Sequence, residues 1–352
     1  MTRGFGTFLR DGVAHLGFRS GEAVVDLGEG SLDALLPQGR AAWERATEEA
    51  VTAAERGDAL PLADVEPRLP FTVADYVDFY SSLEHATNLG RMFRPDSEPL
   101  LPNWRHLPVG YHGRAGTVVV SGTPVRRPQG QSSPPDGGAP SFGPSKRLDI
   151  ELELGFVVGV PSTLGEPVPA AAFAEHVFGV LLVNDWSARD IQAWEYVPLG
   201  PFLGKSFATS ISAWVTPLAL LEDRRVAAPA QEPEPLPHLR VEGAWAFDIP
   251  LEVELNGEVI AAGNARGLYW TMPQQLAHAT SNGASVRTGD LMASGTISGA
   301  ERGSEGSLIE LTRTGAEPLR LAAGGERTFL EDGDEVVLRG EPLGEVRGRI
   351  VP

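Results

Sequence analysis

Glycine and proline interrupt this chain too often for it to fold as a bundle of long helices. Its 352 residues include 41 glycines and 29 prolines, about a fifth of the total. Both residue types favour turns, so their frequency predicts short elements joined by many turns, with strands dominating. Hydrophobic residues make up 42% of the chain and charged residues 22%, which is enough apolar material for a large core. We therefore expect a mixed, β-rich globular fold.

The hydrophobic pattern divides the chain near residue 70. Residues 1–70 are expected to form a small β-rich domain, because short apolar runs punctuated by glycine precede one helical pattern. The runs are Phe5–Leu9 and Ala23–Leu27, and the helical pattern covers Ala41–Arg56. The proline-rich stretch Pro61–Pro70 is expected to be a linker. Residues 71–352 are then expected to form a second, larger domain.

Within residues 71–352, alternation of apolar residues predicts strands and capping residues predict helices. The expected strands are Leu148–Val160, Phe178–Asn184, Ile249–Leu255 before the hairpin turn Asn256-Gly257, Leu308–Thr312, and Glu335–Leu338. The expected helices are Ser81–Met92, opened by Ser81 and Glu84 at capping-box spacing, and Thr271–Asn282, ended by Gly283. Irregular loops are expected over Pro128–Ser145 and Ala227–Leu239.

Charge and cysteine content exclude several classes of protein. The formal net charge of −18 argues against nucleic acid or an anionic membrane as a partner. The absence of cysteine excludes disulfides, thiolate nucleophiles and cysteine-ligated metals. The first residues lack the apolar core of a signal peptide, and no apolar run approaches the roughly 18 residues of a membrane span, so we expect a cytoplasmic protein. Lys146 and Lys205 are the only lysines among 29 basic residues, so each is a stronger candidate for a specific role than an ordinary surface charge would be.

An alternation of acidic and apolar residues is the most informative local pattern. Over Leu148–Leu154 the strand period of two places Asp149, Glu151 and Glu153 on one face. A solvated strand face is one interpretation. The other is a buried acidic face, because the same strand continues into the wholly apolar Gly155–Val158. Buried carboxylates repel one another unless a cation offsets their charge.

Two further carboxylates favour the second interpretation. Asp185 ends the apolar strand Phe178–Asn184, where sheets commonly carry functional groups, and Asp78 lies just before the helix at Ser81. Carboxylates from three segments, without cysteine and with only seven scattered histidines, suit a hard cation such as Ca²⁺ or Mg²⁺. Spacing alone does not show that these residues converge.

A second set of polar residues lies on two predicted helices. Arg189 and Gln192 are three residues apart and share a helix face, with Tyr196 one turn further on. His85 lies in the first turn of the helix that begins at Ser81, where the helix dipole favours a neutral imidazole base. An ordinary surface helix and a packing histidine remain the alternatives.

Longer segments resemble the fumarylacetoacetate hydrolase family over roughly residues 71–352. The segments that carry the resemblance are Asp75–Ser82 with His85–Asn88, Leu101–Trp104 leading to Gly110–Arg114, Asn184–Ser206, Ala293–Gly299 and Thr328–Glu335. The segment before Phe71 is shorter than in the animal enzymes of the family, and the loop Ala300–Ser307 differs in composition. Glu84 is unusual beside His85.

The resemblance implies a small N-terminal SH3-like β domain followed by a β-roll catalytic domain, in a homodimer. It places metal ligands for Ca²⁺ and/or Mg²⁺ on Asp78, Glu151, Glu153 and Asp185, with Lys205 and Thr209 near the metal. It makes His85 the water-activating base and Glu310 its orienting partner. Groups that stabilise developing negative charge fall on Arg189, Gln192 and Lys205. Substrate-holding positions fall on Tyr80, Arg94, Tyr111, Gln192, Tyr196 and Thr296.

The implied reaction is metal-dependent hydrolysis of the carbon–carbon bond of 4-fumarylacetoacetate, a small β-diketo acid. The products are fumarate and acetoacetate, in the last step of tyrosine and phenylalanine catabolism. One alternative is a related enzyme of the superfamily that hydrolyses, isomerises or decarboxylates an acylpyruvate or another β-diketo acid. A non-catalytic binding protein is a third possibility, but it would be expected to have lost His85, Lys205 or a metal carboxylate, and all are present.

Overall fold

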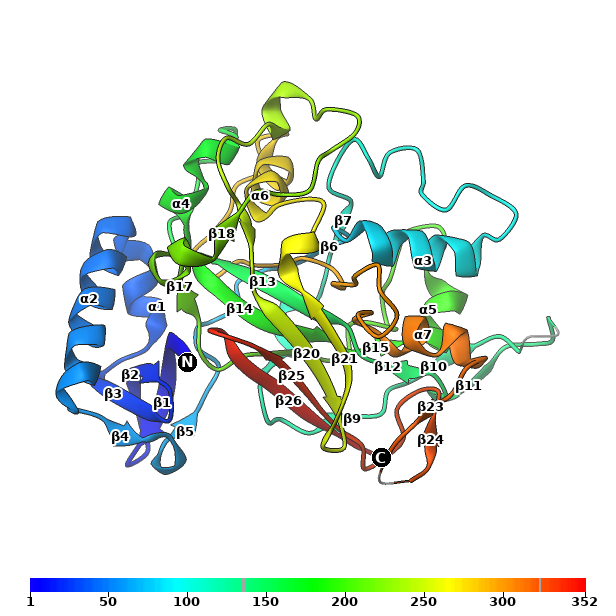
Figure 1. The fold of residues 1–352 in the computed structure, drawn as a ribbon, viewed down its shortest axis with the longest axis horizontal. Helices are drawn as coiled ribbons and strands as arrows, with labels where there is room; N and C mark the ends of the chain where they lie inside the picture. The colour runs from blue at the N-terminus through cyan, green and yellow to red at the C-terminus, as the bar shows by residue number, and fades with distance from the viewer. Residues whose placement is uncertain (135–136, 323) are drawn as a thin grey trace.

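The computed structural model describes residues 1–134, 137–322 and 324–352. Two large sheets form the body of the molecule, and a smaller N-terminal sheet packs at one side of it (Figure 1). Among the described residues, no helix is long and apolar enough to cross a membrane. The fold is mixed and β-rich, as the sequence predicts.

The N-terminal region forms a five-stranded antiparallel sheet in the order β4-β3-β2-β1-β5. Its strands are β1 (Arg3–Arg10), β2 (Val13–Ser20), β3 (Ala23–Glu29), β4 (Leu60–Pro61) and β5 (Glu66–Pro67), and its helices are α1 (Leu32–Leu35) and α2 (Arg40–Arg56). The predicted apolar runs and helix are confirmed. The stretch Pro61–Pro70 is more than a linker, because parts of it return to the sheet as β4 and β5. Both lie at sheet edges, where proline's missing N–H is tolerated.

The first large sheet holds the strands that support the candidate site. Its order is β7-β6-β22-β13-β14-β16-β8, with β17 paired to β14. The bounds are β6 (Tyr76–Phe79), β7 (Gly110–His112), β8 (Val118–Val120), β13 (Leu152–Val158), β14 (Val177–Asp185), β16 (Thr209–Ile211), β17 (Thr216–Pro217) and β22 (Leu291–Ala293). The short pair β12 (Leu148–Asp149) and β15 (Ser187–Ala188) lies at the end of β13 and β14.

The second large sheet has the order β21-β20-β25-β26-β9 and lies against the first (Figure 1). Its strands are β9 (Val125–Arg126), β20 (Pro250–Leu255), β21 (Glu258–Asn264), β25 (Glu335–Gly340) and β26 (Gly344–Val351). The predicted hairpin is confirmed, since Asn256 and Gly257 both have positive φ at its turn. Leu154 and Leu182 of the first sheet join Leu251 and Leu338 of the second in one buried core.

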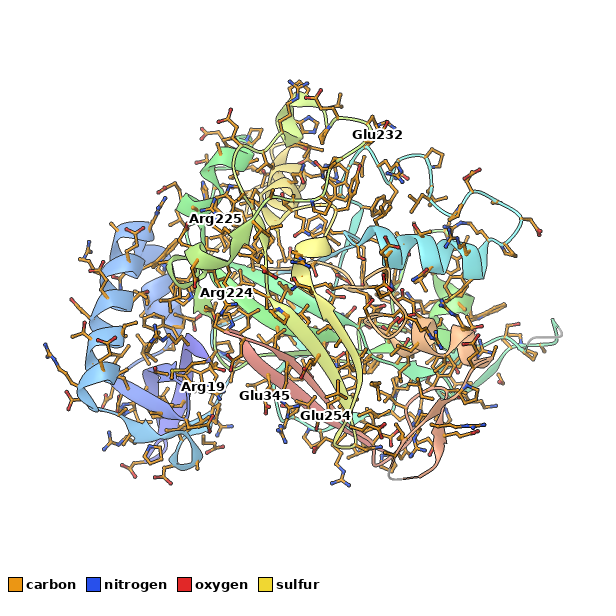
Figure 2. All side chains as sticks on the ribbon, viewed as in Figure 1. Arg19, Arg224, Arg225, Glu232, Glu254 and Glu345 are labelled. Atoms are coloured by element: carbon orange, nitrogen blue, oxygen red, sulfur yellow. The ribbon has the colours of Figure 1, made fainter. Side chains whose placement is uncertain are left out.

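Alternation along the second sheet leaves charged residues on its other face. Leu251 and Val253 are buried, whereas Glu254 forms an ion pair with Arg339, which also approaches Glu345 at 3.6 Å. Glu254 and Glu345 are labelled on β20 and β26 in Figure 2. The polar side of the sheet therefore faces solvent, and its apolar side faces the first sheet.

The opposite face of the first sheet packs against the N-terminal region. Val157, Leu181 and Leu291 share a buried cluster with Phe5 and Trp43. Backbone hydrogen bonds between Phe5 and Val215 join the two regions in both directions, at 2.9 and 2.7 Å. This half of the sheet face is therefore apolar and covered.

Several helices and smaller strand pairs surround the sheets. The helices are α3 (Leu83–Phe93), α4 (Phe173–His176), α5 (Arg189–Glu195), α6 (Met272–Thr280) and α7 (Leu308–Leu311). The remaining strands are β10 (Gln129–Ser132) with β11 (Ser141–Pro144), β18 (Arg225–Val226) with β19 (Ala246–Phe247), and β23 (Leu319–Arg320) with β24 (Glu326–Arg327).

Three sequence predictions need correction. The segment Leu308–Thr312, expected to be a strand, begins the short helix α7, because the side chain of Asp149 accepts hydrogen bonds from its first backbone N–H groups. The loop Pro128–Ser145 contains the hairpin β10–β11, which projects from the body in Figure 1, although residues 135–136 lie outside the described part. Its strands lack an apolar alternation and are held by backbone pairing. The cap of α3 is Ser82 and not Ser81.

The predicted loop Ala227–Leu239 is confirmed, apart from one 3-10 turn at its end.

Candidate metal centre and catalytic pair

Four buried carboxylates converge at one end of the first large sheet. They come from β6 (Asp78), from the residue pair between β12 and β13 (Glu151), from β13 (Glu153) and from the end of β14 (Asp185). One oxygen of each lies within 4.8 Å of the others. Glu153 and Asp185 alternate in register with the apolar Val157 and Leu181, so the acidic cluster continues the same sheet face beyond the apolar half.

Asp149 does not join this cluster, although the strand period predicts it on the same face. The strand is interrupted at Ile150 between β12 and β13, so the period of two does not carry through. The Asp149 carboxylate instead accepts hydrogen bonds from Arg189 Nε at 2.8 Å and from backbone N–H groups.

The acidic cluster is incompletely hydrogen-bonded. Asp78 Oδ1 and Glu153 Oε1 are buried and receive no hydrogen bond from any described residue. Burial, together with the charge of Asp185, raises the pKa of Asp78 well above its ordinary range. Burial and the charge of Asp78 do the same to the pKa of Glu153. Buried, unpaired carboxylate oxygens of this kind are what a hard cation binds.

Lys205 offsets the charge on the other side of the cluster. Its Nζ donates to Asp185 Oδ2 at 2.7 Å and to Glu151 Oε2 at 2.5 Å. Burial alone would lower the pKa of Lys205, but Asp185 and Glu151 outweigh it and raise the pKa above its ordinary value. Burial would likewise raise the pKa of Glu151, but Lys205 and Arg189 hold it below its ordinary range. Lys205 is therefore a protonated, buried group, whereas Lys146 is exposed.

Two hydroxyl groups complete the surroundings of Asp185. Thr209 Oγ1 donates to Asp185 Oδ1 at 2.9 Å, and Tyr111 Oη donates to Asp185 Oδ2 at 3.2 Å. The structure thus brings Lys205, Thr209 and Tyr111 to one carboxylate of the cluster.

His85 and Glu310 form a buried pair. His85 Nδ1 lies 2.6 Å from Glu310 Oε2, and the two side chains are 2% and 0% exposed. His85 is in the first turn of α3, where its backbone N–H donates to Ser82 Oγ at 3.3 Å. Burial would raise the pKa of Glu310, but His85 outweighs this effect and the pKa falls to about 2. The Tyr80 ring packs edge-on against His85 at 5.2 Å between centroids.

Three further side chains fix Glu310, and the sequence analysis missed them. Ser307 Oγ and Ser298 Oγ donate to Oε2 at 2.6 and 2.9 Å, and Asn88 Nδ2 donates to Oε1 at 2.9 Å. Ser298 and Asn88 lie within the segments that carry the resemblance, but no spacing rule connects them with Glu310. Ser307 lies in the loop that departs from the family.

Two of the three predicted anion-stabilising residues, Arg189 and Gln192, lie on α5, and the third, Lys205, lies outside it. Arg189 Nη1 contacts Glu151 Oε1 at 2.7 Å and donates to Gln192 Oε1 at 3.3 Å. Arg189 Nη2 is buried, and no group in the described part of the chain accepts a hydrogen bond from it. Tyr196 follows at the end of α5 and is 46% exposed.

Two predicted substrate-holding residues keep unused polar atoms. Thr296 Oγ1 and Arg94 Nε are buried without a hydrogen-bond partner among residues 1–134, 137–322 and 324–352. Arg94 Nη2 donates to the backbone of Pro99 at 2.8 Å, at the end of α3. Within these described ranges, no hydrogen bond or ion pair joins Arg94 to the acidic cluster.

Comparison with known proteins agrees with this geometry. Residues 75–351 match the family model of the fumarylacetoacetate hydrolase C-terminal region. The chain is 48% identical to a fumarylacetoacetase of Rattus norvegicus over 351 residues, covering 92% of this chain and 84% of the relative. It is 52% identical to a fumarylacetoacetase of Homo sapiens over 304 residues, covering 82% and 73%.

A solved structure shares the fold at lower identity. A maleylpyruvate hydrolase from Sphingobium sp. SYK-6, in complex with manganese(II) and pyruvate, superposes with a TM-score of 0.59 and 16% identity over 99% of both chains. At that identity the match concerns the fold alone.

Proposed function

This chain belongs to the fumarylacetoacetate hydrolase family, and from that premise we propose how its residues act. It is a hydrolase that cleaves the carbon–carbon bond of 4-fumarylacetoacetate to give fumarate and acetoacetate. The observation that carries the assignment of roles is the juxtaposition of four buried carboxylates with a buried His85–Glu310 pair.

A divalent cation fits the acidic cluster. The ligands would be Asp78, Glu151, Glu153 and Asp185, because they supply hard oxygen donors and two of those oxygens have no partner in the described part of the chain. Hard oxygen ligands favour Ca²⁺ or Mg²⁺. When bound, the cation supplies Lewis-acid stabilisation of negative charge on a diketone oxygen. Lys205 and Thr209 hold Asp185 in place beside it.

His85 acts as the general base. Its Nδ1 faces Glu310, so the proton of a neutral imidazole is held at Nδ1 and Nε2 is left to accept a proton from water. Glu310 keeps the ring in one orientation and stabilises the imidazolium that forms. The carbonyl carbon that receives the water then carries an oxygen with developing negative charge.

Arg189, Gln192 and Lys205 stabilise that charge. Arg189 Nη2 is a buried donor that no described residue uses, and Lys205 brings a second buried positive charge. Fixed donors of this kind act strongly where water is excluded. Together with a bound cation they would offset the negative charge of the carboxylates, so that a protein of formal charge −18 can take an anionic substrate.

The substrate is held by side chains that surround these groups. We assign this role to Tyr80, Arg94, Tyr111, Gln192, Tyr196 and Thr296. The unpartnered Thr296 Oγ1 and Arg94 Nε support the assignment, since buried polar atoms without a partner in the described chain are available to a ligand.

The proposed reaction is tested by following the ultraviolet absorbance of fumarylacetoacetate in the presence of purified protein. We expect loss of absorbance that stops after thorough treatment with EDTA and returns with Ca²⁺ or Mg²⁺. The melting temperature should fall with the chelator, because a ligand at 100 times its Kd adds about 2.7 kcal/mol. Consumption of an acylpyruvate but not of fumarylacetoacetate would favour the related superfamily activity. An unchanged rate and melting temperature after EDTA would contradict the metal site.

We extend the proposal to the organisation of the chain. Residues 1–70 are assigned to an SH3-like domain and residues 71–352 to the catalytic domain, and the protein is assigned to the cytoplasm as a homodimer. The five-stranded N-terminal sheet supports the first assignment. Exposed apolar side chains after α5 support the dimer, since Leu199 is 96% and Phe202 62% exposed. Leu199→Glu should shift the mass measured by light scattering from dimer to monomer, and a monomeric wild-type protein would contradict the dimer.

A further inference from the structure

One buried carboxylate outside the acidic cluster connects three parts of the catalytic site. Asp149 is 0% exposed and its two oxygens receive four hydrogen bonds. Oδ1 accepts from the backbone N–H groups of Ile150 and Leu308 at 2.8 and 2.7 Å. Oδ2 accepts from Arg189 Nε at 2.8 Å and from the backbone N–H of Ile309 at 3.1 Å. The donors are Ile150, which follows β12, Arg189 of α5, and Leu308 and Ile309 of α7.

Three of these four contacts fix groups that have, or adjoin, an assigned role. The contact with Nε orients the guanidinium of Arg189, so that Nη1 meets Glu151 and Nη2 stays unused by the described residues. The contacts with Leu308 and Ile309 fix the start of α7, and the next residue is Glu310, which holds His85.

We propose that Asp149 is a positioning residue that sets the spacing between the anion-stabilising Arg189 and the base pair His85–Glu310. This inference rests on the roles given under the proposed function. Among the described residues, the Asp149 side chain forms no hydrogen bond with the carboxylate cluster or with the imidazole of His85, so it acts through its neighbours. A misplacement of about 1 Å between a catalytic group and its substrate costs about 10²-fold in rate.

The test is the substitution Asp149→Asn. An asparagine has one oxygen and one NH₂ group, so in either orientation one backbone N–H of α7 must face a donor, and in one orientation Arg189 Nε faces it as well. We expect kcat to fall about 10²-fold, KM to change less than threefold, and metal affinity measured by calorimetry to stay within twofold. Asp149→Ser, which keeps one acceptor and leaves room for water, should lose a similar factor in kcat.

Asp334→Asn is the matched control. Asp334 is 3% exposed and pairs with Arg327 at 3.0 Å, and it contacts none of the assigned catalytic residues in the described structure. We expect it to lower the melting temperature while kcat per folded molecule stays unchanged.

Three outcomes would overturn the inference. The first is a wild-type kcat in folded Asp149→Asn or Asp149→Ser, with only a lower melting temperature. The second is an equal loss of kcat in Asp334→Asn. The third is failure of both Asp149 variants to fold, which would make Asp149 a folding residue. His85→Ala in the same assay separates this test from the proposed function: if it keeps a normal kcat, the base assignment fails whatever Asp149 does.

Discussion

Asp149 and Glu153 are both buried carboxylates at the same end of the first sheet, only four residues apart, yet their surroundings differ. Each carboxylate oxygen of Asp149 accepts two hydrogen bonds. Glu153 Oε2 accepts one hydrogen bond, from the backbone of Gly295 at 3.0 Å, and Oε1 has no described partner. Residue type and burial therefore do not distinguish a positioning group from a ligand-binding one. Between these two residues the difference is the unmet hydrogen-bonding capacity of Glu153, whereas the other proposed ligands Glu151 and Asp185 have partners on both oxygens.

The largest expected effect concerns Glu310 and its partner His85. Like Asp149, Glu310 is fully hydrogen-bonded, so we expect it to act through its partner. His85→Ala should lower turnover by about 10²–10⁴, the usual contribution of a positioned base, and should leave metal binding intact. Glu310→Gln should give a smaller loss. Turnover, metal content and melting temperature measured on one preparation distinguish a catalytic role of the pair from a structural one. A metal-loaded His85→Ala protein with wild-type turnover would remove the pair from the mechanism.

Lys205 extends the comparison to the positive charges. Lys205→Met should lower the rate by about 10²–10³, because it removes a buried donor that faces the developing charge. Lys146→Met is the natural control, since the other lysine of the chain is exposed, and its rate should be unchanged. Steady-state kinetics of both variants provide the measurement. Equal losses of rate in the two variants would contradict a specific catalytic role for the buried Lys205.

Glu153→Gln examines the unsatisfied carboxylate directly. Changing a residue that only orients a metal ligand costs 10–100-fold in affinity, so losing a ligand should cost at least about 10²-fold. The melting temperature of the metal-free protein should not fall, because the substitution removes repulsion from Asp78. Calorimetric titration with Ca²⁺ measures the first effect. Unchanged affinity in Glu153→Gln, or an equal loss in Asp149→Asn, would break the distinction between the two residues.

The smallest expected effect is a pH dependence of stability in the metal-free protein. The folded pKa of Glu153 is raised above its ordinary value of 4.5, so this group contributes stability below pH 4.5 and loses it as the pH rises through the folded pKa. Each such group changes the free energy of unfolding by at most about 1.4 kcal/mol per pH unit. Glu310, with a pKa of about 2, acts in the opposite direction and only at lower pH.

Melting curves of the metal-free protein from pH 4.5 upward should therefore show a decline that Glu153→Gln reduces. A melting temperature that rises with pH in this range would contradict the cause given for the shift. Added Ca²⁺ should remove the decline, because the bound cation favours the ionised carboxylates.

Much of this site was accessible from the sequence, because its strands obey simple periods. The alternation through Glu151 and Glu153 and the apolar run ending at Asp185 are confirmed by the positions of those side chains. Asp149 does not follow the same rule because Ile150 and Glu151 interrupt the strand between β12 and β13, and the alternation of residue types gives no sign of that break.

Short elements and distant contacts limited the rest. Leu308–Leu311 is too short for its apolar pattern to distinguish a strand from a helix, and the hydrogen bonds that make it helical come from a residue about 160 positions away. The spacing of Ser81 and Glu84 predicts the wrong cap for α3, because the adjacent Ser82 accepts the hydrogen bond from the backbone N–H of His85. Asn88 meets Glu310 across 222 residues, a separation at which no sequence period operates.

One face of the first large sheet has an apolar half, which the N-terminal region covers, and an acidic half, which holds the four carboxylates. Phe5 and Trp43 keep water from Leu181 and Leu291, and the carboxylates begin where this cover ends. Removing residues 1–70 would expose Leu181 and Leu291 to water, at a cost in stability that grows with the apolar area exposed. Because β13 and β14 carry both this apolar surface and the carboxylates Glu153 and Asp185, the loss of stability would fall on the strands that hold the acidic cluster.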